Sequence, residues 1–140
     1  GQGTVAVTNA ADGLWTTSDG TVTTNGGGAL TFVNAGTLRK SAGPGTLLLT
    51  GFFAYTNTGT LDIQSGTLQL GSTLLTSGQV SLSAGTVFLT SGVTFATGST
   101  FSGPGTLTMN GTTTVTGDVA ITVPTGCHDA SHSADRRSRR

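Results

Sequence analysis

"NTGTLDIQSGTLQL" occupies residues 57–70, and "TSGQVSLSAGTVFL" repeats the same pattern at residues 76–89. Within both stretches an aliphatic residue alternates with a polar one, as in Leu61 and Ile63. Alternation with a period of two is typical of a β-strand that buries one face. Ser-Gly and Thr-Gly pairs separate the alternating segments and indicate turns. The two stretches therefore predict short strands joined by tight corners.

The pattern recurs at steps of 19 to 21 residues. A unit of about 19–20 residues with three short strands predicts an all-β fold, the parallel β-helix or β-solenoid, with one unit per coil. Stacked coils lie about 4.8 Å apart, so equivalent residues lie above one another. These equivalent residues form four predicted columns: Leu47, Leu68, Val87 and Leu107; Leu49, Leu70, Leu89 and Met109; Phe53, Leu74, Val93 and Thr113; and Leu38, Leu61, Val80, Phe101 and Val119.

One corner of each coil combines a polar residue with a glycine. We expect a polar ladder of Asn34, Asn57, Ser77, Thr97 and Thr116 along the stack. We also expect the glycines that follow to supply a positive φ angle, namely Gly36, Gly59, Gly78, Gly98 and Gly117. The segment "GFFAYT" (residues 51–56) lengthens one step to 23 residues, which predicts an insertion that takes Phe52 and Tyr55 out of the regular pattern. An antiparallel sandwich or barrel is the alternative fold, but the matched columns favour the solenoid.

Composition sets the domain limits and excludes some partners. Residues 1–123 are predicted to form one solenoid domain, with residues 1–28 less regular, and residues 124–140 a disordered or loosely docked tail. That tail holds four of the six basic residues. Only 9% of residues are charged, and the formal net charge is zero. Nucleic acid is therefore not an expected partner. No apolar run approaches the ~20 residues of a membrane span.

Three phrases carry a resemblance to known proteins: "NAGTLRKSAGPGTLLL" (residues 34–49), "NTGTLDIQSGTLQL" and "GPGTLTMNGTTTV" (residues 103–115). They resemble the repeats of secreted bacterial surface proteins, the filamentous-haemagglutinin-like and autotransporter-passenger-like β-solenoids. The resemblance implies export, localisation as a secreted or cell-surface protein, and further solenoid coils of the same longer chain as partners. It implies a structural or adhesive role and supplies no catalytic residues.

An enzymatic role is not expected from the acidic residues. Glycoside hydrolysis usually needs two carboxyl groups about 5–9.5 Å apart. Before the tail the acids are Asp12, Asp19, Asp62 and Asp118, and Asp62 and Asp118 lie about three predicted coils apart. We therefore predict a non-catalytic spacer or display scaffold, and keep a polysaccharide-active β-helix enzyme as an alternative.

Other side chains suggest ligand contacts. A carbohydrate-binding module is the second hypothesis, with Trp15, Phe52, Phe53 and Tyr55 contacting glycans or host surfaces. Arg39 and Lys40 could bind an anionic sugar, but we favour one pointing outward and one capping a turn, with Asp62 nearby on the next coil. No cofactor or metal is expected, because the spacing of the possible ligands matches no closed zinc site; these ligands are Cys127, His128, Asp129 and His132.

Overall fold

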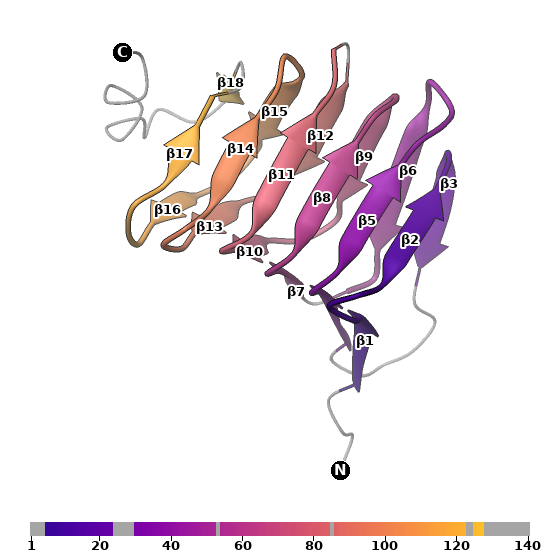
Figure 1. The fold of residues 1–140 in the computed structure, drawn as a ribbon, viewed down its shortest axis with the longest axis horizontal. Coiled ribbons are helices and arrows are strands. Elements are labelled where there is room, and N and C mark those ends of the chain that lie inside the picture. The colour runs from indigo at the N-terminus through magenta and orange to yellow at the C-terminus, as the bar shows by residue number, and fades with distance from the viewer. Residues whose placement is uncertain (1–4, 24–29, 53, 85, 123–124, 128–140) are drawn as a thin grey trace.

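The computed structural model describes residues 5–23, 30–52, 54–84, 86–122 and 125–127. In these ranges the chain forms strands and turns without a helix, and the strands make three parallel sheets (Figure 1). Consecutive strands belong to different sheets, so the chain visits each of the three sides once per coil. The predicted all-β parallel solenoid with three strands per coil is confirmed.

Each sheet contains six strands in the described ranges, and successive coils contribute neighbouring strands. The first sheet consists of β1 (Val5–Asn9), β4 (Leu30–Asn34), β7 (Ala54–Asn57), β10 (Leu74–Thr76), β13 (Val93–Phe95) and β16 (Thr113–Val115). The second sheet consists of β2 (Leu14–Thr17), β5 (Thr37–Lys40), β8 (Thr60–Ile63), β11 (Gln79–Leu82), β14 (Thr100–Ser102) and β17 (Ala120–Ile121). The third sheet consists of β3 (Gly20–Thr23), β6 (Thr46–Thr50), β9 (Thr67–Leu70), β12 (Val87–Thr90), β15 (Thr106–Met109) and β18 (Thr125–Cys127).

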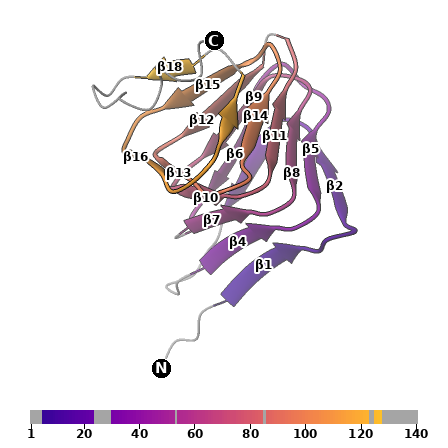
Figure 2. The ribbon, with the colours of Figure 1, turned by 60° about the vertical axis from the view of Figure 1, so that its left-hand side comes forward.

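Figure 2 shows the stacked coils, whose three sheets surround a common interior. The alternating sequence turns every second side chain of the central strands into this interior. In β5 and β8, Leu38 and Leu61 are buried and lie in register. That column continues through Val80 and Phe101, as the sequence predicts. Its last member is Ile121 instead of the predicted Val119. The core is therefore a set of apolar columns that run along the stack.

The register of β12 differs from the sequence prediction by one residue. Phe88, not Val87, pairs with Leu68 and Leu107, and Leu89 pairs with Gln69. The predicted columns through Val87 and Leu89 are therefore wrong. A one-residue slip exchanges the buried and exposed faces of a strand. Both faces of "TVFLT" contain apolar residues, so alternation alone did not distinguish them.

Aromatic packing and satisfied hydroxyl groups explain the observed register. Phe88 is fully buried and lies edge-on to Phe101, with ring centroids 6.2 Å apart. Thr86 and Thr90 flank it on the inward face and are also buried. Thr86 donates to the Ser83 carbonyl at 2.6 Å, and Thr90 donates to that of Gly92 at 3.2 Å. Buried hydroxyls are tolerated when they are hydrogen-bonded.

The prediction that residues 51–56 take Tyr55 out of the regular pattern is wrong, whereas Phe52 lies outside the strands, between β6 and β7. Tyr55 lies in β7, in register with Phe32 and Leu74. It takes the column position predicted for Phe53, which lies outside the described residues. Phe52 is also buried and contacts the Phe32 ring at a centroid distance of 5.5 Å. The extra residues therefore enlarge the aromatic core of the early coils.

The corner glycines are needed for close approach, and only Gly98 of the predicted set has a positive φ angle. A side-chain carbon at Gly59 would overlap the carbonyl oxygen of Gly36, and one at Gly78 would overlap that of Gly59. The same carbonyls accept hydrogen bonds from the next coil, as in Thr60 N to Gly36 O at 2.8 Å. Glycine here lets one corner rest directly on the preceding one.

The described strands extend slightly past the predicted domain boundary at residue 123. β18 pairs with β15 in parallel and adds a sixth strand to the third sheet. Residues 128–140 of the predicted tail lie outside the described residues. At the other end, β1–β3 stack in register on β4–β6, so the described part of residues 1–28 forms a coil like the others.

The register of β12 can be tested by truncating one side chain on each face of the strand. Phe88→Ala is expected to lower the free energy of unfolding by about 3–5 kcal/mol, because it empties a buried aromatic position. Val87→Ala, the matched control on the outward face, is expected to change it by less than about 1 kcal/mol. Urea denaturation of both variants measures the difference. A larger loss for Val87→Ala would support the rejected register.

Candidate functional site

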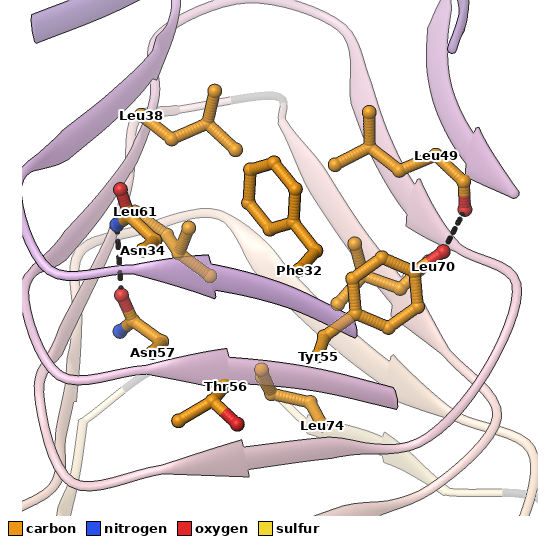
Figure 3. Close-up of a pocket in the computed structure, with 10 residues that line it drawn as sticks. All are labelled: Phe32, Asn34, Leu38, Leu49, Tyr55, Thr56, Asn57, Leu61, Leu70 and Leu74. Carbon is orange, nitrogen blue, oxygen red and sulfur yellow. Dashed lines mark hydrogen bonds between the residues drawn. The ribbon is translucent and has the colours of Figure 1, made fainter. Parts of the chain in front are cut away.

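A ladder of side-chain amides runs along one corner inside the stack, and Figure 3 shows the hydrogen bond between Asn34 and Asn57. Asn9 donates through Nδ2 to Oδ1 of Asn34 at 2.8 Å. Asn34 donates in the same way to Asn57 at 2.9 Å, and Asn57 donates to Oγ1 of Thr76 at 3.3 Å. Each amide donates to the following coil, so the ladder has one direction.

The asparagines also hold the backbone of the corner. Nδ2 of Asn34 donates to the carbonyl oxygen of Thr60 at 2.8 Å, and Nδ2 of Asn57 donates to that of Gln79 at 3.2 Å. Asn34 and Asn57 are almost completely buried. The sequence prediction identified these two residues but missed Asn9, and it named Ser77 where Thr76 supplies the hydroxyl.

A second polar corner surrounds the ammonium group of Lys40. Lys40 is 1% exposed, and its Nζ donates to Oδ1 of Asp19 at 2.7 Å. The carbonyl oxygens of Ala42, Gly43 and Ser65 lie 3.1, 2.8 and 2.9 Å from the same nitrogen. These groups come from three successive coils, so one buried cation ties all three together.

Asp19 completes this corner from the first coil. Its second oxygen, Oδ2, accepts a hydrogen bond from the backbone N–H of Gly45 at 3.0 Å. The hydrogen bond from Lys40 holds the pKa of Asp19 below its ordinary value, although partial burial acts to raise it. Asp19 therefore remains a carboxylate and compensates the buried charge of Lys40.

Arg39 points outward from the same strand. Its Nε lies 2.9 Å from Oδ2 of Asp62 on the next coil, and this oxygen also accepts a hydrogen bond from Gln64. The Arg39 side chain is 36% exposed. Arg39 therefore points outward beside Asp62, and Lys40 caps a turn. This is the arrangement that the sequence favoured.

Three of the four aromatic residues that the sequence selected for glycan contact lie in or against the core, and the fourth, Phe53, lies outside the described residues. Tyr55 and Phe52 are buried, with exposed fractions of 2% and 6%. Trp15 is partly buried and packs on Phe32, with ring centroids 5.5 Å apart. A surface glycan would have to open the core to reach Tyr55 or Phe52, whereas Trp15 lies in the first coil.

Among the described residues around these rings, the void that the structure contains is too small for a sugar. A void of about 10 Å³ lies between the asparagine ladder and the aromatic side chains of the early coils. That is about the space that a single water needs. Its lining consists of Phe32, Asn34, Leu38, Leu49, Tyr55, Thr56, Asn57, Leu61, Leu70 and Leu74 (Figure 3). The Tyr55 hydroxyl donates to the Leu49 carbonyl across it.

Asp12 and Asp19 both lie in the first coil, but at opposite ends of β2, and the other two described acidic residues lie in later coils. Asp62 lies in β8, and Asp118 lies before β17, three coils further along the second sheet. Within the described ranges, no group of three or more His, Cys, Asp or Glu residues could hold a metal ion. The candidate ligands His128, Asp129 and His132 lie outside those ranges, as does the side chain of Cys127. No described helix is long and apolar enough to cross a membrane.

Comparison with other proteins adds no family assignment. No protein-family model, curated protein or solved structure matches this chain. The class that the geometry defines is a three-sided parallel β-solenoid with two buried polar corners.

The role of Lys40 can be separated from that of Arg39 by paired substitutions. Lys40→Met keeps the aliphatic stem but removes hydrogen bonds from a charged donor, so unfolding should become easier by roughly 1.5–3 kcal/mol. Arg39→Met removes a surface ion pair, and a change of roughly 0–1 kcal/mol is expected. Chemical denaturation at pH 7 compares them. Equal effects would show that the Lys40 contacts do not stabilise the stack.

Tyr55 gives a pH-dependent test of the interior. Burial raises the pKa of Tyr55 to about 12, whereas a tyrosine in an unfolded chain ionises near pH ~10. Its contribution to stability is therefore complete below about pH 10 and is lost as the pH rises toward 12. Tyr55 is the single tyrosine, so tyrosinate absorbance follows it directly. Ionisation of the folded chain near pH ~10 would mean that the ring is solvated.

The matched variant Tyr55→Phe isolates this titration. It lacks the ionisable hydroxyl but keeps the ring, so its stability should fall less steeply than that of the parent over the same alkaline range. Thermal unfolding measured at several pH values gives the two slopes. Parallel slopes would assign the alkaline loss to other groups.

Proposed function

We propose that this chain is a non-catalytic structural segment of a secreted or cell-surface bacterial protein, acting as a rigid spacer or display scaffold. The observation that carries the proposal is the unbroken stack of three parallel sheets, in which every coil is paired on all three sides. A protein of this kind works through its shape. It separates what is attached at one end from what is attached at the other.

The contacts between coils support a mechanical role, because they resist the separation of neighbouring coils. Each coil contacts its neighbours through three strand pairings, a column of apolar side chains and, in the early coils, the asparagine ladder. Arrays of this kind derive their stability from nearest-neighbour interfaces. Separating two coils therefore requires breaking many bonds together, which is the property that a stiff spacer needs.

The composition and the resemblance support the location. The Gly- and Thr-rich phrases resemble repeats of exported bacterial solenoids, and the low charge matches a chain built mainly of strands and tight corners. The single cysteine also fits bacterial surface proteins, which often dispense with this residue. Surface display is proposed from these features together.

Single-molecule stretching tests the mechanical role. The full chain is placed between two marker domains of known unfolding force, and is pulled from its ends. A spacer is expected to unfold in one or a few distinct high-force events. The Asn34→Leu variant is the matched control, and its events should occur at lower force because the ladder is interrupted. Gradual extension of the parent chain without distinct events would contradict a rigid spacer.

A glycan array tests the competing hypothesis in the same preparation. No specific binding is expected for a spacer. Binding that disappears in the Trp15→Ala variant, with the fold retained by circular dichroism, would instead identify a carbohydrate-binding module.

A further inference from the structure

The N-terminal end of the stack presents an incomplete coil interface. Among the described residues, nothing pairs with the outer edges of β1, β2 and β3, which are the terminal strands of their sheets. Val7 heads the column of Phe32 and is 40% exposed. Trp15 heads the column of Leu38, and only part of its ring is covered. Free strand edges beside apolar side chains favour the addition of another strand layer.

The amide ladder indicates what that layer must supply. Oδ1 of Asn34 accepts from Asn9, and Oδ1 of Asn57 accepts from Asn34. Nδ2 of Asn9 makes its donations toward Asn34, Gly13 and Thr37, while its Oδ1 has no donor among the described residues. The open position is therefore an acceptor, placed where a preceding coil would carry a donor.

We propose that this end docks a further β-solenoid coil whose side chain at the ladder position carries an N–H or O–H donor, as Asn, Ser and Thr do. The inference rests on the proposed spacer function and specifies how the spacer is extended. Three strand pairings, an apolar contact over Trp15 and one side-chain hydrogen bond to Asn9 define the interface.

The charges at this end do not oppose docking. Asp19 already pairs with Lys40, so its carboxylate needs no new partner. The corner of the first coil is closed locally, because the N–H of Gly13 donates to the Ala10 carbonyl at 2.8 Å. Asp12 in that corner is exposed. An added coil would therefore cover apolar side chains and strand edges while the Asp19–Lys40 pair stays intact.

A second copy of this chain fits the end less well. Two N-terminal ends facing each other would bring the Asn9 acceptor toward its equivalent. In a head-to-tail arrangement the last described coil would offer Val115, which occupies the ladder column beyond Thr76 and Phe95 and has no donor. The chemistry thus favours a coil with a polar ladder residue over self-association.

Trp15 reports directly on this interface because it is the single tryptophan. In the test chain, a copy of residues 31–53 is inserted between Val5 and Ala6. The copy carries Lys40→Thr, the residue that the first coil has at this position, so no ammonium group lacks its Asp19 partner. Ala6 is equivalent to Ala54 through Thr31, so the inserted coil joins in register. Trp15 fluorescence is expected to shift to the blue, acrylamide quenching to fall at least twofold, and the melting temperature to rise.

The matched control carries Asn34→Leu in the inserted copy only. It keeps the strands and the apolar contact but lacks the donor, so a smaller rise in melting temperature is expected. Tyr55 absorbance titration verifies that the original core is intact in both chains. An equal rise in the two chains would overturn the requirement for a donor.

Two results would overturn the docking proposal itself. If acrylamide quenches Trp15 as strongly in the extended chain as in the parent chain, the first coil caps the stack and the docking proposal fails. The stretching experiment could still support a spacer in that case. Concentration-dependent protection of Trp15 in the unmodified chain, with dimers in sedimentation, would identify a second copy as the occupant.

Discussion

The close stacking of one corner on the next is the constraint on which the rest of the structure depends. Gly36, Gly59 and Gly78 bring each coil against the carbonyl oxygens of the preceding one. At that separation the amide of Asn34 reaches both Asn57 and the next backbone carbonyl. A glycine without the asparagine would leave buried carbonyls unpaired, and an asparagine without the glycine could not approach its partner. Together they hold the first four coils in register along this corner.

The two polar corners and the aromatic columns stabilise the stack in different ways. The asparagine ladder joins the first four coils along one edge. Lys40 joins the first three at another corner, through Asp19 and carbonyls of the following turns. The aromatic groups around Phe32 and Phe101 fill the space between them. The polar groups specify which residues lie opposite, while apolar burial supplies most of the driving force.

The fold could be predicted from the sequence because its repeat and its alternation have independent physical causes that agree. The register of β12 could not, since both faces of its sequence are partly apolar and the choice depends on the distant ring of Phe101. The place of Tyr55 was missed because the three-residue longer step was taken for an insertion. The Lys40 contacts span residues 19 to 65, and no local pattern indicates which coil supplies the counter-ion. A search for Asn-x-Gly finds Asn25, Asn34 and Asn57 but not Asn9, whose glycine follows four residues later.

A double-mutant cycle on the ladder tests its central role most directly. Asn34→Ala, Asn57→Ala and the double variant are compared by urea denaturation with the parent chain. Because the two amides are hydrogen-bonded to each other inside the core, a coupling of about 0.5–3 kcal/mol is expected, with the double variant losing less than the sum of the single losses. Strictly additive losses, or single losses below about 0.5 kcal/mol, would contradict a ladder that fixes the register of the stack.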